Sequence, residues 1–299
     1  MKKNMKIFKY FFLLLIVSII SVELILRWYG LHDLPTYRED VDYEYIHHPN
    51  QKRMVYRNYF FTNSFGMRSG DIDNSKRKIL LIGDSVINGG NRNSNEQLAS
   101  TIIQSNLGDS IQVLNVSSGS WGPDNGMQFI KKHGGFDAQL ICLVFNSHDA
   151  GDVMDFKPTV NINPVKPGKN DKFALMAFSR RFLLPKIKTG LNNNYEEKEY
   201  ILKETSELNP GWKFFLEYCV AKRIPLIVYL HAERNEWKKR KYNAEGEKII
   251  NFCKENNIKL VKDIDVLKEE YFSDGIHLNK DGQKMIADIL SPIIEKIID

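Results

Sequence analysis

Five short runs of apolar residues, rich in isoleucine, leucine and valine, stand out along the chain after residue 77. Because the apolar residues are consecutive rather than alternating, each run is typical of a strand buried on both faces of a parallel sheet. The runs are Lys78–Ile82, Ile111–Val116, Gln139–Phe145, Pro225–Leu230 and Ile258–Val261. Segments with helical spacing lie between them, including Glu96–Leu107, Trp212–Ala221 and Ala244–Glu255. We therefore predict a three-layer α/β/α fold with a doubly wound, mostly parallel, five-stranded sheet.

The final segment has the clearest helical pattern in the chain. From Met285 to Ile298 the apolar residues recur at the spacing of one helix face. Asn279 stands where a side chain can cap the first turn, and Pro292 is expected to kink the helix.

Two segments do not follow the alternation of strands and helices. Residues 31–76 show no sustained period, and we expect an irregular segment there. A second stretch, at about 151–208, contains three prolines and one amphipathic piece, Phe173–Ile187. We interpret this stretch as an insertion over the site, in which the amphipathic piece forms a folded lid or a membrane-facing patch.

The N-terminal residues have the composition of an export signal. Four lysines and no acidic residue precede the apolar run Tyr10–Leu26, which Glu23 interrupts. No small-residue cleavage site follows the run, so we predict an uncleaved membrane anchor within residues 1–30 rather than a removed signal peptide. The lysines place the N-terminus in the cytoplasm and the rest of the chain on the outer side of the membrane.

Composition adds limits on function. The chain has 299 residues, 42% of them apolar, which is enough for one large core, and its net charge of +5 is spread too evenly to indicate nucleic acid binding. The three cysteines, at 142, 219 and 253, are interpreted as small core residues. The histidines lack paired ligand spacing and no phosphate-binding loop is present, so we predict no metal and no cofactor.

The residues best suited to catalysis follow the first apolar run. Gly83, Asp84 and Ser85 come directly after it, where a tight turn at the carboxyl end of a strand would expose the serine hydroxyl in a cleft. A serine nucleophile needs a base. Near the end of the chain, Asp274 and His277 are three residues apart, so the carboxylate can hold one imidazole nitrogen while the other faces Ser85.

With these two motifs, the sequence resembles the SGNH or GDSL hydrolase superfamily, over about residues 77–299 apart from the insertion. The resemblance implies a flavodoxin-like catalytic domain in which Ser85, His277 and Asp274 form a catalytic triad. It also implies an oxyanion hole made by the Ser85 and Gly119 backbone N–H groups, because Gly119 matches the glycine block of the family.

The third block of the family, G-x-N-D, is altered in this chain. It reads Asn146-Ser147-His148-Asp149, so a histidine replaces the asparagine that would complete the oxyanion hole. Either the His148 ring or the Asn146 amide could donate instead, and the motif position favours His148.

The resemblance and the predicted location together suggest a substrate class. We expect a serine esterase that removes O-acyl groups, such as O-acetyl, from an extracytoplasmic carbohydrate or surface polysaccharide. An O-acyltransferase with the same triad is the first alternative, and a catalytically silent envelope scaffold protein is the second.

Overall fold

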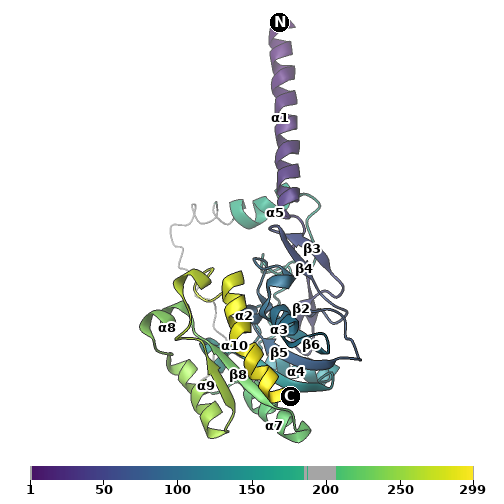
Figure 1. Ribbon diagram of the computed structural model, residues 1–299. Helices are drawn as coiled ribbons and strands as arrows, with labels where there is room; N and C mark the ends of the chain where they lie inside the picture. The colour runs from purple at the N-terminus through teal and green to yellow at the C-terminus, as the bar shows by residue number, and fades with distance from the viewer. Residues whose placement is uncertain (1, 185–186, 188–206, 299) are drawn as a thin grey trace.

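The computed structural model describes residues 2–184, 187 and 207–298. It consists of a long N-terminal helix, α1 (Lys2–Tyr29), that extends away from an α/β domain (Figure 1). The C-terminus lies on that domain, at the end of the last helix.

A five-stranded parallel sheet forms the centre of the domain. Its strands are β5 (Arg77–Gly83), β6 (Ile111–Ser117), β7 (Ala138–Asn146), β8 (Leu226–His231) and β9 (Lys259–Lys262). They lie in the order β6-β5-β7-β8-β9, and every pair is parallel. The order reverses direction between β5 and β7, and ligands of such sheets bind at the carboxyl ends of the strands at this point. The predicted strands and fold class are confirmed.

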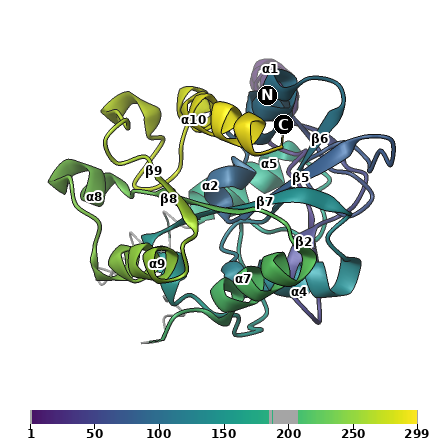
Figure 2. The same cartoon turned by 60° about the horizontal axis from the view of Figure 1, so that its bottom comes forward.

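Helices cover both faces of the sheet, as Figure 2 shows, so the domain has three layers. One face carries α2 (Ser85–Asn88), α3 (Ala99–Leu107) and α10 (Lys280–Ile298), and the other carries α4 (Pro123–His133), α7 (Pro210–Lys222) and α9 (Ala244–Glu255). The α/β domain also contains α8 (Arg234–Lys239) and the short turns η1 (Asn95–Gln97), η2 (Ser147–Ala150) and η4 (Glu269–Tyr271). As predicted, the Asn279 side chain caps α10 by accepting the N–H groups of Asp281 and Gly282.

The two central strands approach each other too closely for a side chain at the end of β5. A Cβ atom added to Gly83 would lie 2.1 Å from the carbonyl oxygen of Val144 on β7. Glycine is therefore required at this position, and it lets β5 run straight into the turn that carries Ser85.

The prediction of an irregular segment over 31–76 is wrong. This region contains two antiparallel hairpins, β1 (Tyr37–Asp40) with β2 (Glu44–His47), and β3 (Lys52–Val55) with β4 (Asn58–Phe61). Each strand has only four residues, which is too short for a clear alternating pattern. The β3–β4 turn also lacks the usual glycine, because Tyr56 and Arg57 both adopt positive φ there.

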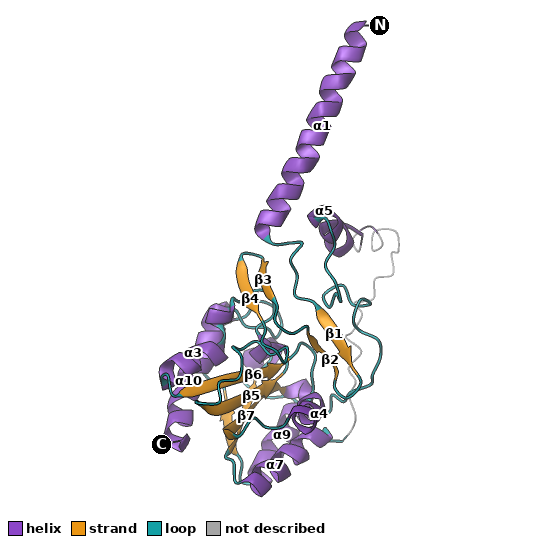
Figure 3. Cartoon of the chain, turned by 90° about the vertical axis from the view of Figure 1, so that its right-hand side faces the viewer, coloured by secondary structure: helices purple, strands orange, loops and turns teal. Residues whose placement is uncertain are grey.

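The described part of the insertion packs along the β1–β2 hairpin. Glu44 accepts the N–H groups of Asp155 and Phe156, and the carbonyl of Pro167 accepts the Tyr37 N–H. The segment then reaches α5 (Ala174–Phe178) and the π-helical turn η3 (Ser179–Leu183), beside the end of α1 (Figure 3). The amphipathic piece Phe173–Ile187 is described except for residues 185 and 186, and its role as a lid or a membrane-facing patch stays a prediction.

Helix α1 is long and apolar enough to cross a membrane. Within its segment Met5–Tyr29, a window of 18 residues has a mean hydropathy of 2.3, and none of that window is buried inside the protein. A signal sequence has the same properties, so the helix by itself indicates either export or anchoring.

Candidate active site

Ser85 is the first residue of α2 and follows β5 at the point where the strand order reverses. The Asp84 carboxylate caps the helix by accepting the Val86 N–H at 2.8 Å. Asp84 is buried, whereas Ser85 is partly exposed. The turn therefore holds the backbone rigidly and leaves the serine hydroxyl accessible.

The structure brings Ser85, His277 and Asp274 together, although 192 residues separate the serine from the histidine. The Nε2 atom of His277 lies 2.9 Å from Ser85 Oγ, and its Nδ1 atom lies 2.9 Å from Asp274 Oδ2. A carboxylate can only accept, so Nδ1 carries the proton and Nε2 presents a lone pair to the serine hydroxyl. This arrangement can take a proton from Ser85.

Several donors hold Asp274 in its ionised form. Burial alone would raise the pKa of this carboxyl, but hydrogen bonds from the His277 ring and from the backbone N–H groups of His277 and Ile276 keep it well below its usual range. The side chains of Asp274 and His277 are both 43% exposed, so the pair is accessible to solvent.

Gly119 lies beside the serine, as the glycine block predicts. A Cβ atom added to Gly119 would be 3.9 Å from the Ser85 Cβ. The Tyr45 hydroxyl, from the β1–β2 hairpin, donates to the carbonyls of Gly119 and Ser120 at 2.9 and 3.1 Å. The sequence analysis missed this contact, because the hairpin that supplies Tyr45 was itself not predicted.

The two alternatives for the third oxyanion donor have different surroundings. Asn146 is fully buried, its amide donates to Asp84 at 2.8 Å, and its side-chain oxygen accepts the His148 N–H. The His148 side chain is 28% exposed, and its Nδ1 lies 3.2 Å from a Glu233 carboxylate oxygen. Asn146 is thus engaged in support of Asp84, while His148 is the more accessible of the two.

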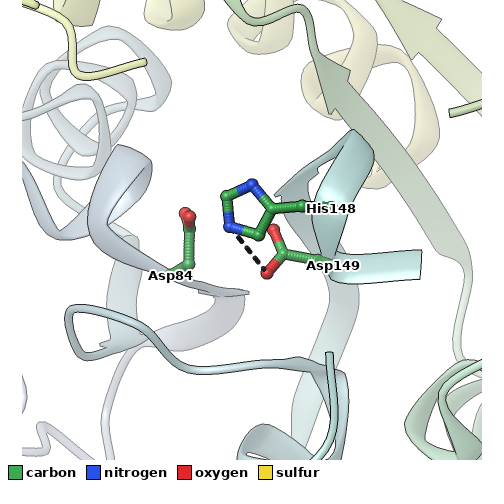
Figure 4. Close-up of side chains that lie close together, drawn as sticks. All are labelled: Asp84, His148 and Asp149. Atoms are coloured by element: carbon green, nitrogen blue, oxygen red, sulfur yellow. Dashed lines mark ion pairs between the residues drawn. The ribbon is translucent and has the colours of Figure 1, made fainter. Parts of the chain in front are cut away.

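The His148 ring lies between the carboxyl groups of Asp84 and Asp149 (Figure 4). One potential ligand atom from each of these three residues lies within 4.8 Å of the others, a spacing that could hold a metal ion. However, both carboxylate oxygens of Asp84 and one of Asp149 already accept N–H groups. Burial would lower the pKa of His148, but Asp149, Glu233 and Asp84 raise it to about 10. We therefore interpret His148 as the cation that balances this cluster.

A second histidine–aspartate pair lies beneath the loop that carries Asp274 and His277. His231 is fully buried at the end of β8, with Nδ1 2.6 Å from Asp263 Oδ2 and Nε2 2.9 Å from the carbonyl oxygen of Ile276. Asp263 directly follows β9, and its contact with His231 holds the imidazole ring in the core.

Comparisons with known proteins give remote likenesses only. No family model and no curated protein matches the chain. Solved structures that it resembles include a lipase/acylhydrolase from Enterococcus faecalis, with 12% identity, coverage of 74% of this chain and 96% of that one, and a TM-score of 0.44. An esterase from a Pseudoalteromonas species has 14% identity, coverage of 74% and 98%, and a TM-score of 0.41. A carbohydrate acetylesterase family member from Sinorhizobium meliloti has 13% identity, coverage of 74% and 99%, and a TM-score of 0.40.

Proposed function

We propose that this protein is a serine esterase in which Ser85 is the nucleophile, His277 the base and Asp274 the group that orients the base. The observation that carries the proposal is the continuous chain of contacts from Ser85 Oγ through both ring nitrogens of His277 to the Asp274 carboxylate. A serine, a base within hydrogen-bond reach and a third group that orients the base are what nucleophilic catalysis requires. Since these distances come from the site itself, the proposal does not depend on the remote likenesses.

The reaction would proceed through an acyl-enzyme. Ser85 Oγ bonds to the ester carbonyl carbon while its proton passes to His277 Nε2. When the tetrahedral intermediate collapses, the bond to the alcohol oxygen breaks and that oxygen takes the proton from His277. Water then attacks the acyl carbon and gives a proton to His277. When the bond to Ser85 Oγ breaks, Oγ takes that proton back from His277 and the acid is released.

We further propose that three donors stabilise the oxyanion: the backbone N–H groups of Ser85 and Gly119, and the ring of His148. The accessibility of His148 and the engagement of the Asn146 amide with Asp84 favour the histidine. The neighbouring carboxylates raise the pKa of His148, so a protonated ring would provide a charge-assisted hydrogen bond where the family has a neutral amide.

The proposed substrate is an O-acylated carbohydrate outside the cytoplasm, with acetyl as the proposed acyl group. The apolar helix α1 supports this location, since it can anchor the chain with its N-terminal lysines in the cytoplasm. The open, partly exposed triad is compatible with a large substrate such as a surface polysaccharide.

The nucleophile is tested by two measurements on the full chain in detergent. Ser85→Ala should abolish hydrolysis of an aryl acetate, and a fluorophosphonate should label Ser85 in the unmodified chain. His277→Ala should label far more slowly than the unmodified chain. Unchanged hydrolysis by Ser85→Ala would refute the assignment, and a folded chain that resists labelling would favour the scaffold alternative.

Hydrolysis and acyl transfer differ only in what attacks the acyl-serine. An acetylated glycan incubated with the protein, with and without an acceptor sugar, separates them by the ratio of free acetate to transferred acetyl. We expect free acetate to dominate, since one predicted span gives no evident route for a cytoplasmic acyl donor. Acetyl recovered mainly on the acceptor would establish the transferase.

A further inference from the structure

An apolar stripe runs along the helical segment formed by α5 and η3. Its side chains lie in these two elements or directly beside them and are 37–56% exposed, and they are Phe173, Met176, Phe182, Leu183, Leu184 and Ile187. Ala174 and Ala177 of the same segment are buried where it meets the rest of the protein. The segment is therefore amphipathic with its apolar side turned outward, opposite to the usual arrangement in a soluble domain.

The segment is fastened to the end of α1. The Glu23 carboxylate accepts the N–H groups of Ala174 and Leu175, at 2.9 and 2.8 Å, and so caps the start of α5. Arg27 pairs with Glu23 at 2.6 Å and also donates to the carbonyl of Lys172. Glu23, the acidic residue that interrupts the apolar run, thus joins α1 to the insertion.

The surroundings of the stripe have the character of a membrane–water boundary. Trp28 and Tyr29 are 65% and 43% exposed at the end of α1, and aromatic residues of this kind favour the headgroup region. Arg180 lies within the stripe with its side chain 63% exposed, and its guanidinium pairs with Asp171 at 3.0 Å. Apolar residues mixed with basic ones favour an anionic lipid surface.

We propose that the α5–η3 segment is a second membrane contact, which lies in the lipid interface of the leaflet where α1 emerges. The proposal rests on α1 being a membrane anchor. Figures 1 and 3 both show α5 beside the end of α1 nearest the domain, where that interface would be. The insertion that carries α5 also bonds to the β1–β2 hairpin, and Tyr45 of that hairpin contacts Gly119. The membrane contact of α5 and η3 would therefore also hold the catalytic domain close to the membrane surface.

The experiment measures the depth of single labelled sites in the full chain. Met176→Cys is labelled with an environment-sensitive fluorophore and reconstituted into nanodiscs of phosphatidylethanolamine and phosphatidylglycerol, with doxyl groups placed near the headgroup or deep in the acyl chains. Leu15→Cys, within α1, reports on the anchor. Val220→Cys, 69% exposed on α7, is the matched control for an apolar surface site away from α1. The native cysteines are buried, and the unmodified chain measures their background.

An interfacial helix buries its apolar side about 5–10 Å below the headgroups, so the Met176 label should lose about half its fluorescence to shallow doxyl groups and less to deep ones. Leu15 should be quenched most by deep groups, and Val220 by neither. If Leu15 is quenched and Met176 behaves like Val220, the inference is overturned while the anchor stands. If the Leu15 label is not quenched either, the membrane anchor and the second membrane contact are both refuted, and the esterase assignment is unaffected. A Met176 label that is shielded from solvent but not quenched would mean that a protein covers the stripe, which also overturns the inference.

Discussion

Two histidine–aspartate pairs lie at the same loop, and they differ in what the second ring nitrogen faces. In the pair of His277 and Asp274, the second nitrogen faces the hydroxyl of Ser85, which can give up a proton. In the pair of His231 and Asp263, it faces the carbonyl oxygen of Ile276, which can only accept. His231 must therefore donate from both nitrogens and carry a positive charge, whereas His277 keeps a lone pair.

The two histidine–aspartate pairs also differ in how deeply they are buried. The His277 and Asp274 side chains are 43% exposed, while those of His231 and Asp263 have no exposure at all. Asp263 is satisfied by two further donors, the Tyr229 hydroxyl and the Ala232 N–H. The comparison teaches that the residue types alone do not identify a catalytic base, because the same pair serves as a structural ion pair when its last partner is an acceptor.

The largest expected effect is on the exposed pair. His277→Ala should reduce kcat/KM by at least about 10⁴-fold, since removing the base of a serine triad disables the nucleophile. Its free energy of unfolding should change little, by about 0.5 kcal/mol, because the side chain is partly exposed. Hydrolysis of an aryl acetate and urea unfolding measure the two quantities. A large loss of stability with retained activity would reverse the roles of the two pairs.

The buried pair should show the opposite result. Asp263→Asn should lower the free energy of unfolding by about 3–5 kcal/mol, because it leaves the buried charge of His231 without its partner. Asp274→Asn is the matched control, since it makes the same chemical change at the exposed pair and should mainly reduce activity. Equal losses of stability in the two variants would remove the distinction drawn from burial.

The sheet could be predicted because its signals are local, whereas the proximity of Ser85 to His277, 192 residues away, could be expected from the resemblance of two motifs to a known family. Consecutive apolar residues identify buried parallel strands, and a serine directly after the first strand needs no distant information to be noticed. The D-x-x-H spacing likewise places Asp274 and His277 on one turn. These elements of the fold match the structure to within a residue or two at most strand ends.

The contacts that support the site could not be predicted, because each depends on a partner far away in the sequence. Tyr45 and Gly119 are in contact although they are 74 residues apart in the sequence, and His231 and Asp263 are 32 residues apart. The β1–β2 and β3–β4 hairpins also have strands too short to show a period. The packing of the folded chain, rather than any sequence pattern, decides where these residues lie.

His148 is a third histidine with a carboxylate neighbour, and the exposure of its side chain lies between those of His231 and His277. His148→Ala should reduce kcat by about 10²–10³-fold, the usual result of removing one oxyanion donor. His148→Asn restores an amide that can donate, so it should retain most of the activity that alanine loses. If Asn146→Ala reduces kcat while His148→Ala does not, and both variants keep their stability, Asn146 is the donor instead.

The smallest expected effect concerns the pH dependence of stability. Although burial would lower the pKa of His231, the Asp263 charge and the two hydrogen bonds raise it above its usual value. A raised pKa means that the folded state holds the proton more tightly, so this stabilisation is complete below about pH 6.5 and is lost as the pH rises through the folded value. The difference in unfolding free energy between the unmodified chain and His231→Gln should therefore shrink above pH 6.5, by at most about 1.4 kcal/mol per pH unit. His148, whose pKa is raised to about 10, changes stability in the same direction, but it is present in both proteins and cancels in the difference. A difference that grows with pH would show that His231 is neutral in the folded protein, and the contrast between the two pairs would then rest on burial alone.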